Sequence, residues 1–365
     1  MQQLERDTVE RDRRVRDAIA NWAPRFTTNG VDYNDFVRVT TSVSTWEEWL
    51  PAWVENGHAY AELAREAEAA GRTVTAGQLW NQSALSYHFA KFVWMVDLER
   101  YAEATRWAVD ALRRAHSLLD PTAERIEIPF EGGKSLVGNL RRPRDDSSQA
   151  PLVLLFPGLD STKEEFFGWE NVFLSRGLAT FSLDGPGQGE TGLETFIAPN
   201  YEVAATAAID ALSTRDDVDL ERIGAAGVSL GGYYAPRAAA YEKRLKAVVG
   251  ISGPFDFAAN WDGMPQQTRE TVCHHTGAAT MEEGREKAGE LNLYDAAKLI
   301  DQPFLSITGR NDRLIPWQQS QRQAEEAPGG EFVLYDDGNH VCNNIPWKYR
   351  PLTADWLMEK LAVQR

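Results

Sequence analysis

The sequence predicts an α/β protein in which a mainly parallel β-sheet is covered by helices on both faces, preceded by an all-helical N-terminal domain. Two observations predict this architecture. Before residue 121, apolar residues recur at helical spacing and no convincing strand is found. After it, short continuous apolar runs alternate with helical stretches, which is typical of strands buried on both faces of a parallel sheet. We therefore expect two domains, residues 1–122 and 123–365.

Helical spacing in the first domain predicts helices over residues 7–22, 46–71, 75–97 and 98–119. Thr45 is a possible N-cap of the second helix and Gly71 is its stop signal. The third helix is apolar on nearly every face, which indicates burial on several sides. Tryptophan is concentrated in this domain, which favours an aromatic packing core. The alternative is that some of these rings line an apolar substrate pocket.

The second domain begins with a predicted β-hairpin over residues 125–130 and 135–141, followed by a polar loop at 145–150. Further strands are predicted at 152–156, 178–183, 223–227, 245–251, 304–308 and 331–335, and helices at 201–212, 230–241 and 317–326. Residues 254–294 break the alternation. We expect them to form a helical excursion at the end of the sheet where ligands bind.

Composition and charge exclude several function classes. Hydrophobic residues make up 43% and charged residues 25%, as in ordinary globular proteins. A formal net charge of −16 disfavours nucleic acid and anionic membranes as partners, because like charges repel. No apolar run is long enough for a transmembrane helix, and the charged first residues lack the apolar core of a secretory signal. Cys273 and Cys342 indicate reduced thiols, so we expect a cytoplasmic protein.

The segment Gly227-Val228-Ser229-Leu230-Gly231 matches the pattern G-x-S-x-G. Roughly 0.1 chance matches are expected in a chain of this length, so the pattern alone is modest evidence. Its context is more specific, because a predicted strand precedes it and a predicted helix follows, as in the nucleophile elbow of α/β-hydrolases. The elbow would expose the hydroxyl of Ser229 as a nucleophile and direct the backbone N–H of Leu230 at an oxyanion. The competing interpretation is an ordinary tight turn.

An acid and a histidine follow in the order that this elbow requires, each just beyond a later predicted strand. Asp312 would orient the imidazole of His340 and stabilise its charged form. His340 would take the proton of Ser229 and deliver it to the leaving group. Asp336 and Asp337 are competing acids, but we interpret them as solvated loop charges and favour Asp312.

The loop after the strand at 152–156 supplies the second predicted oxyanion donor, the backbone N–H of Leu159, with Gly158 allowing close approach. The glycine-rich segment 184–189 lacks the Lys-Ser/Thr ending of a phosphate loop, so we interpret it as a structural turn near the site.

Metal binding is not indicated. Cys273, His274 and His275 are consecutive and do not share a helical face, so we expect a surface or pocket wall. We predict no metal and no cofactor. Cys342 is interpreted as a buried inert thiol and His88 as a core histidine.

Several further segments carry a resemblance that covers the whole chain. They are WAPRF at 22–26, YHFAKF at 87–92, IPFEG at 128–132, GLDSTKEE at 158–165 and DGPGQG at 184–189. With the elbow, they resemble the α/β-hydrolases related to 2,6-dihydroxypseudooxynicotine hydrolase and the fermentation-respiration switch esterases. The resemblance implies a helical cap over the active site and often a homodimer. It also implies that some members cleave carbon–carbon bonds beside a ketone, whereas others act on esters.

The resemblance further implies an additional acidic residue after the strand that follows the elbow helix. The corresponding stretch, residues 255–264, offers Asp256 and Asp262 but no glutamate, which is a departure from the family pattern. As possible substrate-pocket residues we list Asp160, Tyr233, Asp256 and Trp261.

These observations predict a serine-triad hydrolase with a covalent acyl-enzyme mechanism, cleaving a carbon–carbon bond next to a ketone in a small aromatic or polyketide-like substrate. The first alternative is a carboxylesterase or lactonase with the same triad. The second is a binding or non-hydrolytic biosynthetic protein that keeps the scaffold. We expect a small-molecule substrate and a homodimer as partners, and neither nucleic acid nor membrane.

Overall fold

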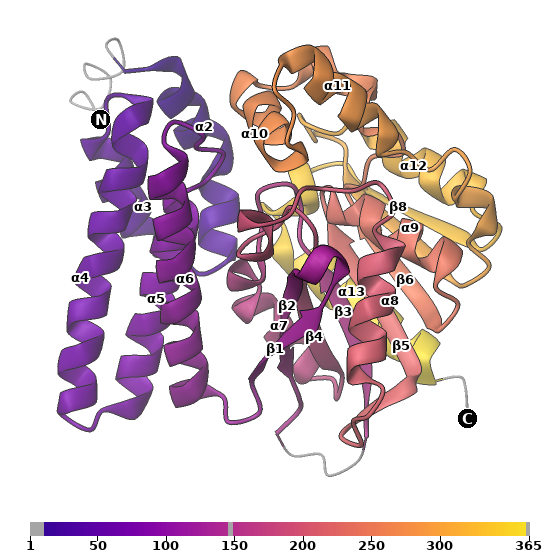
Figure 1. Cartoon of the computed structure of the whole chain (residues 1–365), viewed down its shortest axis with the longest axis horizontal. Coiled ribbons are helices and arrows are strands. Elements are labelled where there is room, and N and C mark those ends of the chain that lie inside the picture. Colours follow the sequence, from indigo (N-terminus) through magenta and orange to yellow (C-terminus); the bar gives the residue numbers. More distant parts are fainter. Residues whose placement is uncertain (1–10, 145–148, 363–365) are drawn as a thin grey trace. The chain divides into compact units, whose positions relative to one another are not determined.

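Five α-helices lie between residues 11 and 121 of the computed structural model, which describes residues 11–144 and 149–362 (Figure 1). They are α2 (Arg13–Thr28), α3 (Tyr33–Ser42), α4 (Trp49–Ala69), α5 (Thr73–Ala90) and α6 (Leu98–Leu119). Aspartates begin three of them, because the side chains of Asp12, Asp32 and Asp97 each accept a backbone N–H of the first turn. These helices form one compact unit, Met1–Pro121, and the rest of the chain forms a second, Thr122–Arg365.

The largest differences from the predicted helices concern α2, α3 and α5. The first predicted helix, residues 7–22, corresponds to α2, and its predicted start at residues 7–10 lies outside the described residues. Helix α2 continues through Pro24 to Thr28 instead of ending at residue 22. That extension buries Phe26, whose ring stacks on Phe89 at 3.9 Å, which offsets the hydrogen bond that proline removes. Helix α3 was not predicted. Helix α5 ends at Ala90 and not at residue 97 as predicted; Val93 lies inside the predicted stretch with φ 40°, which a right-handed helix does not accommodate.

The core of this unit is aromatic, as the tryptophan count suggested. Trp46, Trp49, Trp53 and Trp94 are fully buried. Two of these indoles also form hydrogen bonds: the N–H of Trp49 donates to the carbonyl of Phe89, and that of Trp94 donates to the carbonyl of Trp46. Each of these bonds pairs a buried donor with a backbone carbonyl at or near a helix end.

The second unit contains an eight-stranded sheet with strand order β1-β2-β4-β3-β5-β6-β7-β8. The strands are β1 (Glu124–Pro129), β2 (Ser135–Arg141), β3 (Ala150–Phe156), β4 (Ala179–Asp184), β5 (Val218–Val228), β6 (Leu245–Ile251), β7 (Phe304–Gly309) and β8 (Gly330–Tyr335). Pairs β1–β2 and β2–β4 are antiparallel, and every other neighbouring pair is parallel. The predicted fold class, a mainly parallel sheet preceded by helices, is confirmed. Residues 145–148 of the predicted polar loop lie outside the described residues.

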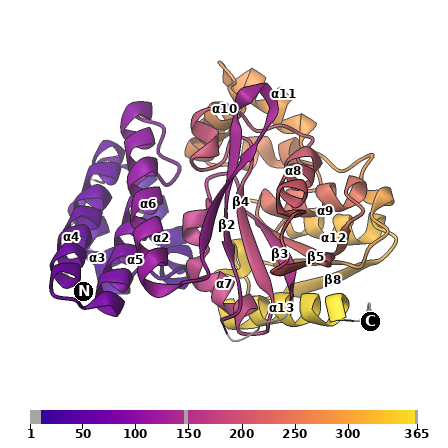
Figure 2. The ribbon, with the colours of Figure 1, turned by 60° about the horizontal axis from the view of Figure 1, so that its bottom comes forward.

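Helices cover both faces of this sheet (Figure 2). They are α7 (Phe167–Leu174), α8 (Glu202–Leu212), α9 (Gly231–Tyr241), α12 (Trp317–Glu326) and α13 (Pro346–Ala362). Alternation along β3 explains the two layers: Leu152, Leu154 and Phe156 belong to a core that includes α8 and α9. Val153 and Leu155 belong to a second core that includes α7 and α13.

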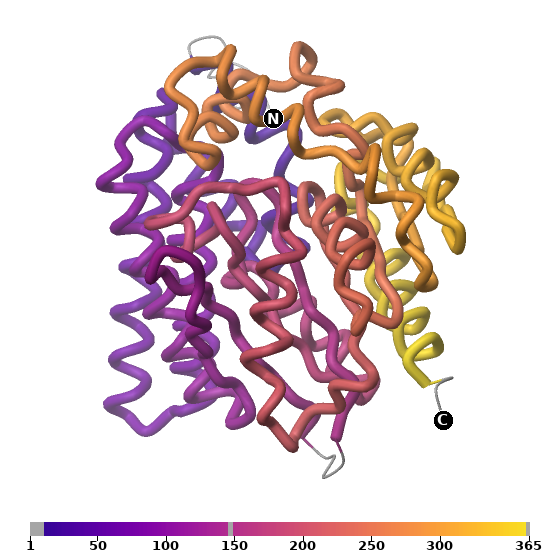
Figure 3. The backbone as a smooth tube through the Cα atoms, turned by 45° about the vertical axis from the view of Figure 1, so that its right-hand side comes forward, coloured from indigo at the N-terminus to yellow at the C-terminus, as the bar shows by residue number. Residues whose placement is uncertain are grey.

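Between β6 and β7 the chain forms η5 (Phe257–Gly263), α10 (Gln266–Thr276) and α11 (Met281–Glu290). This segment is orange in Figure 3. This is the segment predicted as a helical excursion. The remaining short 3-10 turns are η1 (Trp46–Glu48), η2 (Glu131–Gly133), η3 (Lys163–Glu165), η4 (Thr191–Leu193), η6 (Ala297–Leu299) and η7 (His340–Cys342). Within the described ranges, none of the helices has the length and apolar character needed to cross a membrane.

Candidate active site

Ser229 lies in the tight turn between β5 and α9. Its backbone has φ 56°, a left-handed conformation that non-glycine residues rarely adopt. Two backbone bonds hold this geometry: the N–H of Ser229 donates to Ile251 O at 2.8 Å, and its carbonyl accepts from Gly232 N at 2.8 Å. The turn therefore presents the serine hydroxyl at the carboxyl end of a central strand, where ligands of parallel sheets bind.

Steric contacts explain the two glycines of the motif. A Cβ atom on Gly227 would lie 1.9 Å from the carbonyl oxygen of Gly231. A Cβ atom on Gly231 would lie 2.1 Å from the carbonyl oxygen of Phe156. Both contacts are with backbone atoms, which cannot move aside as a side chain can, so only glycine fits at either position.

The hydroxyl of Ser229 begins a chain of hydrogen bonds through two residues that are distant in sequence. Its Oγ lies 2.9 Å from Nε2 of His340, and Nδ1 of His340 lies 2.8 Å from Oδ2 of Asp312. The other carboxylate oxygen of Asp312 accepts the backbone N–H groups of Leu314 and Ile315, each at 2.9 Å. With its carboxylate fully buried and held at both oxygens, Asp312 fixes the orientation of the imidazole.

The competing acids are engaged elsewhere. Asp336 pairs with Arg310 at 2.6 Å and Asp337 pairs with Lys348 at 2.7 Å, and all four side chains are solvent-exposed. The carboxylate beside the imidazole is that of Asp312, as favoured from the order of the strands.

Sequence reasoning missed Ser252, which supports the histidine loop. Ser252 follows β6 with φ 50°, and its Oγ accepts the backbone N–H of Val341 at 3.0 Å. Val341 itself has φ 58°, so the turn that carries His340 is held in an uncommon conformation by this bond. No motif marks Ser252, because its partner is 89 positions away in the chain.

The two predicted oxyanion donors belong to segments that meet at Ser229. A Cβ atom on Gly158 would lie 3.0 Å from Cβ of Ser229, so the loop after β3 packs directly against the nucleophile. Over residues 11–144 and 149–362, no protein acceptor is found for the backbone N–H of Leu159 or of Leu230. Unpaired N–H groups beside a nucleophilic oxygen are what an oxyanion hole requires.

The possible pocket residues differ in their surroundings. Asp160 is half-buried and directly follows Leu159. Tyr233 is fully buried, and its hydroxyl donates to Pro199 O at 2.7 Å, which makes it a packing residue behind the elbow. Burial also raises the pKa of the Tyr233 hydroxyl. Trp261 is buried in the core of the excursion, close to Gly284.

The two acidic pocket candidates of the excursion form hydrogen bonds or ion pairs within this part of the chain. Asp256 caps η5 by accepting the N–H of Ala258 at 3.0 Å, and its other oxygen accepts the hydroxyl of Tyr294 at 2.9 Å. Asp262 is exposed and pairs with Arg285 at 3.2 Å. Neither carboxylate is bonded to a triad residue, so the structure gives these two acids a part in folding the excursion.

A cluster of buried charges lies in the same loop as the oxyanion donor and was not anticipated. Nζ of Lys163 lies 2.7 Å from Glu164, 2.9 Å from Asp184 and 2.7 Å from Glu190. Its backbone N–H also donates to Asp184 at 2.9 Å. Burial opposes the charge on Lys163, but the carboxylates around it hold the pKa of its ammonium above the usual value. Burial raises the pKa of Asp184 to about 6, against the opposing effect of Lys163.

Both cysteines are free. Cys342 is buried, and that burial raises the pKa of its thiol to about 12, consistent with an inert side chain. Cys273 is half-buried in α10. No group of three or more His, Cys, Asp or Glu side chains among the described residues could hold a metal ion.

Comparison with known proteins identifies the family of this chain. A family model described as "Esterase FrsA-like" matches residues 34–337. The chain belongs to the FrsA-like esterase family. It is therefore an enzyme with the α/β-hydrolase fold.

Individual relatives of this FrsA-like protein cover different shares of it. The 2,6-dihydropseudooxynicotine hydrolase of Paenarthrobacter nicotinovorans is 33% identical over 359 residues, which is 97% of this chain and 95% of that protein. A crystal structure of the 2,6-dihydroxy-pseudo-oxynicotine hydrolase superimposes with a TM-score of 0.86 and 32% identity, covering 94% of this chain and 97% of that one. Hydrolase LUC6 of a Fusarium species is 34% identical over 224 residues, 58% of this chain and 53% of that protein.

Proposed function

We propose that the protein hydrolyses a carbon–carbon bond next to a ketone, in a small aromatic or polyketide-like substrate, through an acyl-enzyme on Ser229. The observation that carries the proposal is the unbroken chain of hydrogen bonds from Asp312 through His340 to Ser229. A serine hydroxyl is a weak nucleophile by itself, and this arrangement is the one that activates it for acyl transfer.

In the first half-reaction, Oγ of Ser229 attacks the ketone carbon while His340 accepts its proton. The carbonyl oxygen becomes an alkoxide, which the N–H groups of Leu159 and Leu230 stabilise. The carbon–carbon bond then breaks, and its electron pair leaves with the departing carbon. His340 returns the proton to that carbon, leaving an ester on Ser229. Asp312 stabilises the imidazolium that exists between the two transfers.

In the second half-reaction, water replaces the carbon fragment. His340 takes a proton from the water, whose oxygen attacks the ester carbonyl in the same oxyanion hole. Collapse of this intermediate releases a carboxylic acid, and His340 returns the proton to Oγ of Ser229. One water is consumed for each bond cleaved, and no oxidant or reductant takes part.

The nature of the leaving group restricts the substrate. A departing carbanion is far more basic than an alkoxide, so the broken bond must lie between the ketone and a carbon whose charge an adjacent carbonyl or electron-poor ring can delocalise. This proposal draws on the similarity, over almost the whole chain, to a hydrolase named for a pseudooxynicotine substrate. It also draws on a relative named 20-hydroxy-prefusarin hydrolase, which is 34% identical over 229 residues.

Ester or lactone hydrolysis is the second candidate. Asp256 and Asp262 are bonded inside the excursion, so neither of them is positioned as an additional acid to assist a carbon leaving group. The alkoxide that leaves in ester hydrolysis needs only the proton that His340 delivers. The description of the matching family as an esterase points the same way.

The full chain can be tested with two probes of similar size, benzoylacetone and p-nitrophenyl butyrate. Carbon–carbon hydrolysis predicts stoichiometric formation of a carboxylic acid and a simple ketone from benzoylacetone. Efficient turnover of the ester with no cleavage of the diketone would favour the second candidate. Ser229→Ala should reduce either activity by about 10⁴-fold or more. Unchanged activity in that variant would exclude both hydrolytic mechanisms.

A further inference from the structure

The glycine-rich segment after β4, interpreted from sequence as a structural turn, contains a buried amide with every bonding position filled. The side chain of Gln188 is fully buried. Its Nε2 donates to the carbonyl oxygens of Pro157 at 2.7 Å and Gly158 at 2.9 Å. Its Oε1 accepts the backbone N–H of Gly185 and the hydroxyl of Tyr201, both at 3.1 Å. An amide has two donor hydrogens and two acceptor positions, and all four are used.

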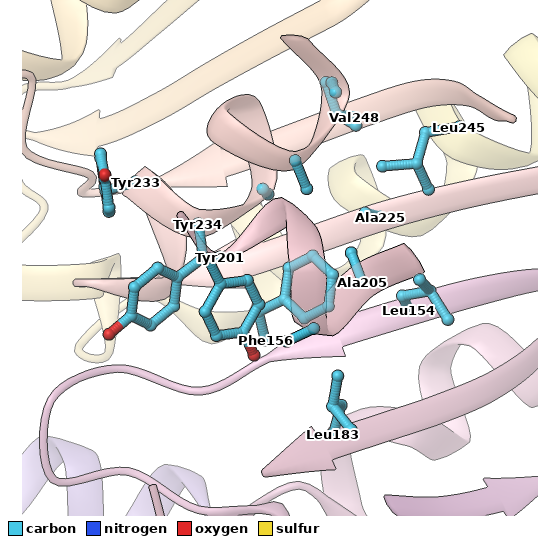
Figure 4. Packing of buried hydrophobic residues seen from close by; sticks show 14 of the residues in the cluster. Leu154, Phe156, Leu183, Tyr201, Ala205, Ala225, Tyr233, Tyr234, Leu245 and Val248 are labelled. Atoms are coloured by element: carbon cyan, nitrogen blue, oxygen red, sulfur yellow. The ribbon is translucent and has the colours of Figure 1, made fainter. Parts of the chain in front are cut away.

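These partners fix which way round the amide lies. Reversing it would place Oε1 against two carbonyl oxygens and Nε2 against an N–H donor, which would replace three attractive contacts by repulsive ones. Packing holds the acceptor side as well. The ring of Tyr201 stacks on Tyr234 with centroids 3.9 Å apart, and Phe156 packs edge-on against it at 5.0 Å (Figure 4).

The two carbonyls that Gln188 binds belong to the oxyanion loop. In a trans peptide the C=O and the following N–H point in opposite directions in one plane, and the described chain contains no cis peptide bond. The carbonyl of Gly158 therefore sets the direction of the N–H of Leu159. The same Gly158 contacts Ser229, so a rotation of this peptide would be felt at the nucleophile.

We propose that Gln188 is a positioning residue that aims the N–H of Leu159 at the developing oxyanion. It does not touch the reacting atoms and acts through the peptide between Gly158 and Leu159. The inference rests on the proposed serine mechanism and adds to it a residue that controls the stabilisation of the transition state. Binding of the uncharged substrate depends little on that N–H, because its direction matters most once charge develops on the oxygen.

The test replaces Gln188 by Met, which keeps the length of the side chain and removes all four hydrogen bonds. Gln302→Met is the matched control. Gln302 is also a buried glutamine that donates to a backbone carbonyl, that of Ala239, but it precedes β7 at the opposite end of the parallel strands. Each variant is assayed for kcat and KM on p-nitrophenyl butyrate, for the Ki of a trifluoromethyl ketone with the same acyl chain, and for Tm.

Both variants should melt at a lower temperature than the wild type. In Gln188→Met, kcat should fall by about 10²-fold with KM changed less than about threefold, and the Ki of the trifluoromethyl ketone should rise by about the same factor as kcat falls. That ketone forms a tetrahedral adduct whose oxygen occupies the oxyanion hole. In Gln302→Met, kcat and Ki should stay within about twofold of the wild type. Equal effects of the two variants on kcat and Ki, or a rise in KM alone for Gln188→Met, would overturn the inference.

Tyr201→Phe provides a milder variant if Gln188→Met does not fold. It removes one hydrogen bond to Oε1 of Gln188 and keeps the stacked ring, so kcat and the affinity for the trifluoromethyl ketone should fall together by a smaller factor. A fall in Tm alone would count against the inference.

Ser229→Ala separates the role of Gln188 from the serine mechanism on which it rests. If it abolishes activity while Gln188→Met behaves like the control, only the role of Gln188 is wrong. If Ser229→Ala remains active, the serine mechanism fails, and the inference fails with it.

Discussion

The helical unit and the sheet unit differ in the contacts that their buried polar groups make. In the helical unit the buried indoles of Trp49 and Trp94 bond to backbone carbonyls, and the buried cations Arg25 and Lys91 lie beside aromatic rings. In the sheet unit buried cations pair with buried carboxylates: Lys163 lies among three carboxylates, and Arg141 pairs with Glu170 at 2.9 Å.

The difference follows from the backbone conformation of each unit, which is regular in the helices and irregular in the loops of the sheet unit. Regular helices satisfy their own N–H and C=O groups, so packing and a few end contacts are enough. The loops at the carboxyl ends of the strands have irregular backbone, and charged side chains bind such loops strongly. Burying a charge is expensive and gives little net stability compared with apolar packing. The buried ion pairs of Lys163 with Asp184 and Glu190 join the loop that carries Leu159 to the segment at the end of β4.

The largest expected effect comes from removing the ion at the centre of that cluster. Lys163→Met should destabilise the sheet unit by about 3–5 kcal/mol, because it leaves carboxylates buried without their partner. Urea denaturation of the full chain measures the change. Lys134→Met is the control, since Lys134 forms only an exposed pair with Glu194 at 3.7 Å and should change stability by less than about 0.5 kcal/mol. Similar losses in the two variants would show that the buried charges do not hold the loop.

A smaller loss is expected in the helical unit. Trp49→Phe should lower stability by about 1–3 kcal/mol, because the carbonyl of Phe89 loses its donor and part of the indole volume is left empty. The comparison is with Trp347→Phe, a tryptophan that is 67% exposed and should change stability by less than about 0.5 kcal/mol. Thermal unfolding followed by calorimetry tests both. A loss at Trp49 as large as that at Lys163 would remove the distinction between the two units.

The smallest effect concerns backbone strain at the nucleophile. At φ 56° glycine is favoured over alanine, so Ser229→Gly should be more stable than Ser229→Ala by about 1 kcal/mol. Ser117, exposed in α6, should show the opposite order, with alanine about 1 kcal/mol better than glycine. Comparing Tm within each pair cancels the loss of the hydroxyl. The same order at both serines would mean that the elbow is not strained.

The sheet could be predicted from sequence because each buried strand is a continuous apolar run between turn residues. The candidate triad could be predicted because a strand, a tight turn and a helix surround Ser229, and Asp312 and His340 follow later strands in a required order. Helix α6 was predicted with its observed limits, since Asp97 caps it and its apolar stripe is regular.

The supports of the site could not be predicted. A lysine in a loop is ordinarily exposed, and nothing local to Lys163 indicates that Asp184 and Glu190 will surround it. Gln188 and Ser252 act on backbone atoms 30 and 89 positions away, and a backbone acceptor leaves no mark in the sequence. Helix α3 escaped notice because it is short and buries few apolar side chains.

The bond between Ser229 and His340 joins residues 111 positions apart, and the strand that leads to the histidine is the last to be synthesised. A chain emerging from the ribosome contains Ser229 long before it contains His340. Strands β3 to β6 can therefore be complete before the residue proposed to activate Ser229 has been made. Truncation before β8 (Gly330–Tyr335) also removes His340, so a fragment that ends there should lack the activity proposed for the full chain.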